Sequence, residues 1–357
     1  MDTLAAAARP TPFVSVVMPV RNEATFLERS LGAVLAQDHP ADRMEILVVD
    51  GGSEDGTGQR AKELGAARVR VLSSPTGTAA AAMNLGIAAA RGDVILRVDG
   101  HAEIGPAHIS RALDALSVTG ADVVGGPIVT RGRGFAGRAL ALAMSSRLGV
   151  GGSRFRVDAA HTGDVDTVPF PAYTRTILRR VGGFDESFVR NQDDEFHLRL
   201  TRAGGRIHLA PELVSIYHAR RRFAAAWTQF VGYGFWKTAV RRKHGGLLSL
   251  RAYVPAVFVV LLAAAVAWSL VALSWLPFLA LAGPYVLCLL LWSVTWGLQR
   301  DARGALGAPW AFAVLHLAYG CGFLMGIVRD ARSQGAESAG IEASVEARVE
   351  ASAGDPA

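Results

Sequence analysis

The sequence predicts an α/β domain, built on a mainly parallel sheet flanked by helices in a Rossmann-like arrangement and followed by transmembrane helices. Between residues 14 and 125, short runs rich in β-branched residues alternate with helical patterns, which is typical of such a sheet. In addition, 51% of the 357 residues are hydrophobic and the mean hydropathy is positive. That hydrophobic content exceeds what an ordinary soluble domain carries, so a membrane part is expected.

The alternating runs give the order of the elements in the first half of the chain. Strands are expected at residues 14–18, 46–49, 69–72, 94–98 and 123–124. Helices are expected between them, at residues 23–37, 57–64, 78–91 and 106–118. Because ligands bind outside the carboxyl ends of the strands in parallel sheets, the polar residues after each strand are the candidates for function.

Three apolar spans follow, at residues 252–273, 276–298 and 309–328, each near the roughly 20 residues needed to cross a bilayer. Lys and Arg flank the first span and the loop between the second and third, whereas the connection between the first and second carries none. The positive-inside rule therefore predicts a multi-pass protein of the inner (plasma) membrane with the α/β domain in the cytoplasm. Arg329 and Arg332 leave an alternative of two spans plus a re-entrant segment.

These patterns divide the chain into five parts. We expect an N-terminal extension (1–12), an α/β catalytic domain (13–215), a basic and aromatic membrane-interface region (216–251), a transmembrane region (252–330) and a disordered tail (331–357). The cysteines Cys288 and Cys321 both fall in apolar stretches, which favours packing over a disulfide or a thiolate metal site.

The positive charge of the chain is concentrated beside the apolar spans. From Leu213 to Arg300 there is no Asp or Glu, while nine Lys or Arg occur and eight of them precede the first span. Such a stretch suits anionic lipid headgroups. Nucleic acid is a competing partner for basic patches, but none of the usual nucleic-acid-binding motifs is present, so we expect no nucleic acid.

A first polar cluster combines the segments that follow the first two strands, residues 19–23 and 50–57. Glycines in the second segment allow the backbone to fold tightly around a flat ligand. Asp50 offers acceptor oxygens for the N–H of a base or for ribose hydroxyls. The alternative is an ordinary turn with a cap before the next helix.

A second cluster is the turn Asp99-Gly100-His101 at the end of the fourth strand. With a glycine between them, Asp99 and His101 can aim both side chains at one cation. A divalent metal there would neutralise a diphosphate leaving group. Magnesium prefers oxygen ligands, whereas an imidazole favours manganese or another transition ion. A solvated loop is the alternative for this turn.

A third cluster, residues 191–195, precedes a short helical pattern. Carboxylates at a helix start are stabilised as anions by the helix dipole. An ionised Asp193 within hydrogen-bond reach of a sugar hydroxyl can act as general base. The alternative is simple helix capping.

The order of these segments from Val14 to about Arg206 resembles the family 2 inverting glycosyltransferases, which have the GT-A fold. The residues around Asn84 and the loop Gly182–Glu186 are similar to further motifs of that family. The resemblance implies that the donor, a nucleotide-sugar, is bound by Pro19, Arg21, Glu23, Asp50, Asn84 and Asp99, that the metal (Mn2+ or Mg2+) is bound by Asp99 and His101, and that Asp193 is the base. The same resemblance implies acceptor contacts from Gly183, Phe184, Gln192 and Asp194.

Three positions depart from the family pattern: His101 stands where a second Asp is usual, Gly51 where many members have Asp, and Gln192 where the acidic pair starts with Glu. The Asp-Gly-His form, the segment Val165–Phe170 and the C-terminal spans resemble the succinoglycan-biosynthesis ExoA-like branch. That branch builds exopolysaccharide repeats on lipid-diphosphate carriers, which implies a polyprenyl-linked sugar as acceptor.

Basic residues lie between the expected base and the bilayer, among them Arg220, Arg221 and Arg222. They are candidates to bind the acceptor's diphosphate. An ordinary positive-inside flank with an aromatic belt explains them equally well.

The resemblance thus implies a membrane-bound hexosyltransferase with UDP-glucose as expected donor. Two alternatives stay open: a polyprenyl-phosphate glycosyltransferase similar to dolichyl-phosphate mannose synthase, and a membrane-tethered nucleotide-binding module without catalysis. The sequence does not determine the oligomeric state.

Overall fold

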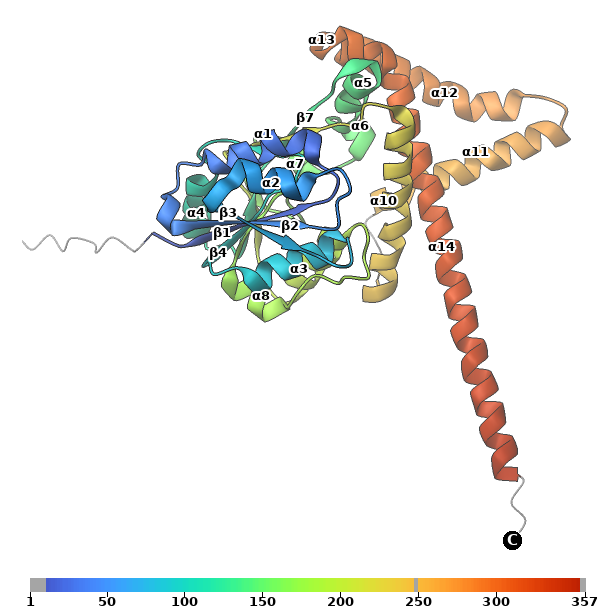
Figure 1. The fold of residues 1–357 in the computed structure, drawn as a ribbon. Helices are drawn as coiled ribbons and strands as arrows, with labels where there is room; N and C mark the ends of the chain where they lie inside the picture. The colour runs from blue at the N-terminus through green and yellow to red at the C-terminus, as the bar shows by residue number, and fades with distance from the viewer. Residues whose placement is uncertain (1–10, 247–249, 354–357) are drawn as a thin grey trace, which may run out of the picture. The chain divides into compact units, whose positions relative to one another are not determined.

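The computed structural model describes residues 11–246 and 250–353, with side chains up to residue 331. The chain divides into two units (Figure 1). The first contains the residues up to Arg221 together with Asp301–Gly307, and the second contains Arg222–Arg300 and the residues from Ala308 on. The expected limits at residues 215 and 251 stay predictions.

The first unit is built on an eight-stranded sheet with the order β3-β2-β1-β4-β9-β6-β10-β8. Its strands are β1 (Val14–Val20), β2 (Met44–Asp50), β3 (Val69–Ser73), β4 (Val94–Arg97), β6 (Val123–Gly125), β8 (Gly163–Asp164), β9 (Ala172–Thr174) and β10 (Ile207–Leu209). The neighbours β3, β2, β1 and β4 are parallel, as the alternating pattern predicted. Their carboxyl ends therefore meet at one edge, where Val20 lies opposite Asp50 in the register.

Strand β9 was not predicted. It inserts between β4 and β6 and runs antiparallel to both. The strand is only three residues long, and its first two residues are fully buried, so it carries no two-residue alternation that a pattern could detect. The sheet is consequently mixed, with a parallel half that carries the expected ligand edge.

A second sheet of three strands was also missed. It has the order β5-β11-β7, from β5 (Ala102–Ile104), β11 (Ser215–His218) and β7 (Ile128–Arg131). Strands β7 and β11 are parallel, although about 85 residues of sequence separate them. Pairing at such a distance depends on the tertiary structure.

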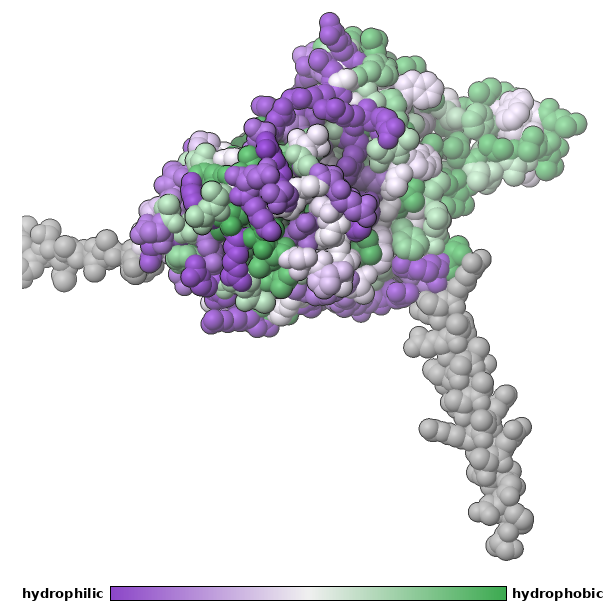
Figure 2. Space-filling view, viewed as in Figure 1, coloured by the Kyte–Doolittle hydropathy of each residue, from purple (hydrophilic) through white to green (hydrophobic). Residues whose placement is uncertain are grey.

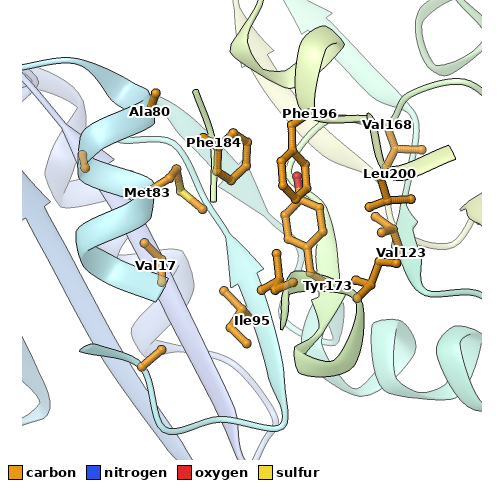
Figure 3. Close-up of a cluster of buried hydrophobic side chains, with 14 of the residues drawn as sticks. Val17, Ala80, Met83, Ile95, Val123, Val168, Tyr173, Phe184, Phe196 and Leu200 are labelled. Carbon is orange, nitrogen blue, oxygen red and sulfur yellow. The ribbon is translucent and has the colours of Figure 1, made fainter. Parts of the chain in front are cut away.

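Helices cover both faces of the large sheet. Helices α1 (Ala24–Leu35) and α2 (Thr57–Gly65) lie on one face, and α3 (Ala79–Ala89) and α8 (Arg175–Val181) on the other (Figure 1). The predicted helix at 106–118 is α4 (His108–Thr119), and the unit also contains α5 (Gly134–Met144), α6 (Arg147–Val150), α7 (Arg154–Val157) and α9 (Gln192–Arg202). Figure 3 shows the core under α3 and α9, in which the rings of Phe184 and Phe196 stack at 4.2 Å with Tyr173 edge-on to both.

The second unit is helical. It contains α10 (Phe223–His244), α11 (Val254–Val271), α12 (Leu276–Trp292), α13 (Leu298–Arg300) and α14 (Ala302–Ala353), the last of which begins in the first unit. Three stretches among the described residues are long and apolar enough to cross a membrane, Val254–Val271, Leu276–Arg300 and Ala302–Ala331. They agree with the predicted spans, and hydrophobic surface predominates on α11 and α12 (Figure 2).

Glycines let α10 and α14 approach closely. A Cβ at Gly234 would lie 2.1 Å from the carbonyl oxygen of Tyr319, and one at Gly322 would lie 2.0 Å from that of Val231. Small residues at such crossings are typical of helix packing within membranes. The tail expected to be disordered lies, from residue 332 on, outside the residues whose side chains are described, and residues 1–10 of the N-terminal extension lie outside the described residues altogether.

Candidate active site

A buried arginine joins two of the predicted site residues. Arg97 is the last residue of β4, and its guanidinium donates hydrogen bonds from Nε to Asp99 Oδ1 (2.7 Å) and from Nη2 to Asp99 Oδ2 (3.3 Å). Its Nη1 donates to Oδ1 of Asp193 on α9. The structure thus brings together the expected metal ligand and the expected base, 94 residues apart in sequence, through a residue that was not among the predicted site residues.

Helix α9 places Asp193 beside Arg97 because Asp193 lies on the same face of the helix as its buried residues. Phe196, His197 and Leu200 lie three, four and seven residues after Asp193, and all three are buried. Figure 3 shows Phe196 and Leu200 in the core. His197 is held through Nε2 by the hydroxyl of Tyr173 (3.0 Å). Since burial lowers the pKa of His197 to about 4, the ring is neutral and fixes the helix without adding charge.

The surroundings of Asp193 suit a general base. Burial raises the pKa of its carboxyl, and the neighbouring Asp99 and Asp194 act in the same direction, while Arg97 acts against them. The pKa of Asp99 is lowered instead: burial opposes its charge, but Arg97 and His101 outweigh burial. Within the described chain, the second oxygen of Asp193 has no recorded hydrogen-bond partner, and 37% of the side chain is exposed. One oxygen is therefore held and the other is open to a ligand.

The turn Asp99-Gly100-His101 packs against the start of α1. His101 Nδ1 lies 2.8 Å from Glu23 Oε1. A Cβ at Gly100 would lie 3.0 Å from both Glu23 Cγ and Val20 Cγ1, so this close approach favours glycine. Ser30 of α1 donates a hydrogen bond to the Gly100 carbonyl (2.7 Å).

The side chains at the Asp99-Gly100-His101 turn meet some of the requirements of a divalent-cation site. With Nδ1–H donating to Glu23, His101 keeps the lone pair of Nε2, for which no partner is recorded among the described residues. A carboxylate that orients a ligating histidine in this way is common around metals. Burial opposes the charge of His101, but Glu23 and Asp99 raise its pKa, so a metal would have to displace a proton there. In the described residues no three His, Cys, Asp or Glu side chains form a metal-binding group.

The two loops of the expected nucleotide site are tied together. Asn22 N donates to Ser53 Oγ (2.9 Å), and Asn22 Oδ1 accepts from Glu54 N (2.9 Å). Asp50 closes its own turn by accepting from Ser53 N (3.0 Å) and Ser53 Oγ (2.6 Å) through Oδ1. Asp50 is the last residue of β2 and so lies at the carboxyl end of that strand, as expected.

Close backbone packing explains why Gly51 stands where many members of the family have Asp. A Cβ there would lie 3.2 Å from Gly77 Cα, so the aspartate common in the family would be crowded. Arg21 Nη1 donates to the Gly77 carbonyl (3.2 Å). Pro19 lies in β1, opposite Val49 of β2 and partly exposed.

Other predicted contacts have mainly structural partners. Asn84 Nδ2 donates to the Phe184 carbonyl (2.9 Å) and to Glu186 Oε1 (2.8 Å), and Asn84 Oδ1 accepts from Phe184 N (2.7 Å). The ring of Phe184 is buried in the core (4% exposed), and a Cβ at Gly183 would lie 2.7 Å from Asn84 Oδ1. The bonds of Asn84 thus hold the 183–186 loop.

Gln192 and Asp194 lie in the first turn of α9. Gln192 is buried, and Asp194 Oδ2 accepts a hydrogen bond from Asn191 (3.3 Å). Asn191 precedes the helix with a left-handed backbone (φ 57°). The acidic first turn suits the helix dipole, while the side chain of the N-cap residue Asn191 makes no capping hydrogen bond to the helix.

A pocket of about 310 Å³ adjoins the turn at His101. Arg220 and Arg221 line it, as do three arginines that were not predicted, Arg29, Arg131 and Arg133. Arg222 directly precedes α10 and belongs to the second unit. Arg131 and Arg133 were missed because only the pairing of β7 with β11 brings them beside residues 220 and 221. Arg97 carried a signal: a charged residue ends an otherwise apolar strand, and buried charges need partners.

Comparisons with known proteins identify the family of the chain. The profile of "Glycosyl transferase family 2" matches residues 15–182. The succinoglycan biosynthesis protein ExoA of Rhizobium meliloti (strain 1021) is 31% identical over 319 residues, which cover 86% of this chain and 93% of that protein.

Two further proteins are similar over much of their length. The dolichyl N-acetyl-alpha-D-glucosaminyl phosphate 3-beta-D-2,3-diacetamido-2,3-dideoxy-beta-D-glucuronosyltransferase of Methanococcus voltae is 27% identical over 241 residues, which cover 65% of this chain and 74% of that protein. Among solved structures, a mannosyltransferase from Pyrobaculum calidifontis in complex with GDP-mannose and Mn2+ has a TM-score of 0.55 and 20% identity, covering 88% of this chain and 87% of that chain. At that identity the likeness shows the shared fold.

Proposed function

The chain belongs to glycosyl transferase family 2, in its ExoA-like branch, and we propose that it transfers a sugar from a nucleotide-sugar to a polyprenyl-diphosphate-linked saccharide with inversion of the anomeric carbon. UDP-glucose is the proposed donor and exopolysaccharide or cell-surface glycan synthesis the proposed pathway. The observation that carries the proposal is the Arg97 bridge, which holds Asp99 and Asp193 together at the carboxyl edge of the parallel strands.

In the proposed reaction Asp193 is the general base. Its free oxygen accepts the proton of an acceptor hydroxyl, and the hydroxyl oxygen attacks the anomeric carbon from the face opposite the diphosphate. Arg97 holds the other oxygen of Asp193 and so keeps the carboxylate oriented. A single displacement of this kind converts an α-linked donor into a β-linked product.

The donor end of the site is proposed at the loops after β1 and β2. Asp50 and the tied loops at residues 21–24 and 51–57 receive the nucleoside. Asp99 and the Nε2 atom of His101 are the proposed ligands of a divalent metal, and Glu23 orients the imidazole. Such a metal, when bound, neutralises charge on the diphosphate. Mn2+ accompanies GDP-mannose in the Pyrobaculum mannosyltransferase, which supports a divalent ion but not a particular one.

The acceptor is proposed to be attached to a membrane lipid. The Methanococcus relative is named for a dolichyl-phosphate-linked sugar, and three helices of this chain are long and apolar enough to cross a membrane. We place the first unit in the cytoplasm on the positive-inside rule, with the protein in the inner membrane.

A donor and acceptor screen tests the proposal. Membranes containing the full chain are incubated with UDP-glucose, other UDP-sugars or GDP-mannose, a polyprenyl-diphosphate-linked saccharide, and Mn2+ or Mg2+. We expect a lipid product one sugar longer than the acceptor. A product formed only from bare polyprenyl phosphate would favour the polyprenyl-phosphate glycosyltransferase alternative. Nucleotide binding without transfer or donor hydrolysis, under any of these metals, would support the non-catalytic module.

A further inference from the structure

The pocket beside His101 is lined by arginines from three separate segments. Arg29 comes from α1, Arg131 ends β7 and Arg133 follows it, and Arg220 and Arg221 follow β11. We call this set the basic pocket. The only carboxylate in its lining is Glu23, which is hydrogen-bonded to His101.

The pairing of β7 with β11 builds the pocket. The two strands run parallel with Arg131 opposite His218, and Ala219 N donates to the Arg131 carbonyl (2.8 Å). Parallel strands end at the same edge, so the basic residues that follow each strand meet there. A Cβ at Gly132 would lie 1.8 Å from the Gly137 carbonyl oxygen, so the backbone between Arg131 and Arg133 has room only for glycine.

Four of the five arginines of the basic pocket can offer their charge to a ligand. Within the described chain, no ion pair is recorded for Arg29, Arg131, Arg133 or Arg221. In contrast, Arg138 on the adjacent α5 binds Asp301 through both Nε (2.8 Å) and Nη2 (2.5 Å). Guanidinium groups match the oxygens of phosphate in a two-pronged geometry, and a doubly or triply charged diphosphate would balance these arginines.

The position of the pocket along the chain favours a ligand attached to a lipid. None of Asp50, Asp99 and Asp193 lines it, so it is separate from the proposed nucleoside and base positions. Arg221 is the last residue of the first unit before α10, and the apolar helices of the second unit follow in sequence. This adjacency in sequence is the reason to consider a phosphate joined to a membrane-embedded chain.

The geometry points to the basic pocket as the site that binds the phosphate group through which the acceptor is joined to its polyprenyl chain, with Arg131 and Arg133 as its new members. This assignment rests on the proposed transferase function. Because His101 belongs both to the pocket lining and to the Asp-Gly-His turn, the acceptor's phosphate is bound next to the donor's diphosphate site.

Steady-state kinetics of Arg131→Gln, Arg133→Gln and the double variant in membranes test the assignment. Hydrogen bonds to charged groups contribute enough that loss of one arginine should raise KM for the polyprenyl-diphosphate-linked acceptor about ten-fold or more, with KM for the nucleotide-sugar kept. Arg179→Gln is the matched control, since Arg179 is an exposed arginine of α8 outside the pocket. An unchanged acceptor KM in the double variant would overturn the assignment.

Three soluble or vesicular probes separate the possible sources of the phosphate. Geranyl diphosphate should compete with the acceptor in the wild type and lose most of its effect in the double variant, whereas inorganic pyrophosphate should compete less well. If the variants instead lose only binding to phosphatidylglycerol vesicles, the pocket is a headgroup site and the assignment fails. If the wild type transfers no sugar to any acceptor, the proposed function fails, and direct binding of geranyl diphosphate still decides about the pocket.

Discussion

Two neighbouring regions of the first unit handle charge in opposite ways. At the Arg97 centre, one buried guanidinium lies between the carboxylates of Asp99 and Asp193. In the basic pocket, five arginines share a lining with a single carboxylate. His101 belongs to the edge of both regions.

The difference reflects exposure to water. Arg97 is buried (5% exposed), and a buried charge without partners is costly, so the protein supplies its counterions. The pocket arginines are exposed and can remain charged in water until a ligand arrives. A balanced buried cluster positions groups for chemistry, whereas an unbalanced exposed cluster is available for binding.

The largest effect is expected when the carboxylate of Asp193 in the Arg97 centre is removed. Asp193→Asn keeps the shape but cannot accept a proton, so kcat should fall about 10²- to 10⁴-fold, the usual contribution of a general base. Donor binding, measured by equilibrium titration of the nucleotide, should be nearly unchanged. Turnover close to the wild-type value would rule out Asp193 as the base.

Removing the buried guanidinium of Arg97 should destabilise the Arg97 centre. Arg97→Met removes the guanidinium between the carboxylates of Asp99 and Asp193, and breaking a buried pair in this way typically costs about 3–5 kcal/mol. Thermal unfolding of the detergent-solubilised protein measures the loss. Arg97→Lys keeps the charge without the planar fork and should recover much of the stability but less of the kcat. Equal stability of the Met variant and the wild type would contradict a structural role for the bridge.

A substitution at His101, the residue shared by the two regions, tests whether this side chain binds a metal. His101→Asp should retain activity and shift the metal preference toward magnesium, because oxygen ligands suit that ion. Changes around a metal typically alter its affinity about 10- to 100-fold, so a shift of that order in the Mn2+ to Mg2+ ratio of half-saturating concentrations is expected. Activity indifferent to both metals and to chelation would argue against a metal at this turn.

The smallest effect concerns the neighbour of the base. Asp193 must be ionised to act, and its raised pKa places the acidic limb of the pH–rate profile above the ordinary range for an aspartate. Asp194→Asn removes one of the charges that raise this pKa, so the limb should move to lower pH. A profile of kcat/KM against pH for the two proteins measures the shift. An unchanged limb, or movement toward higher pH, would show that Asp194 does not raise the pKa of Asp193 as a charge.

Local patterns predicted most of the architecture. The parallel strands, the helices between them and the three apolar spans were identified because side-chain periodicity and apolar length are properties of neighbouring residues. Strands β5, β7, β8, β9, β10 and β11 were missed, because strands of two to four residues carry too little periodicity. The predicted roles of all the site residues, Asp99, His101 and Asp193 included, stay predictions.

The sequence by itself determined the fold class, the membrane part and the order of the polar turns after successive strands. Only the tertiary structure decided which of those polar residues meet: Arg97 with Asp193, His101 with Glu23, and the arginines after β7 with those after β11. The physical reason is that these contacts join residues about 80 to 100 positions apart. They depend on strand register and helix packing, which no local pattern of side chains encodes.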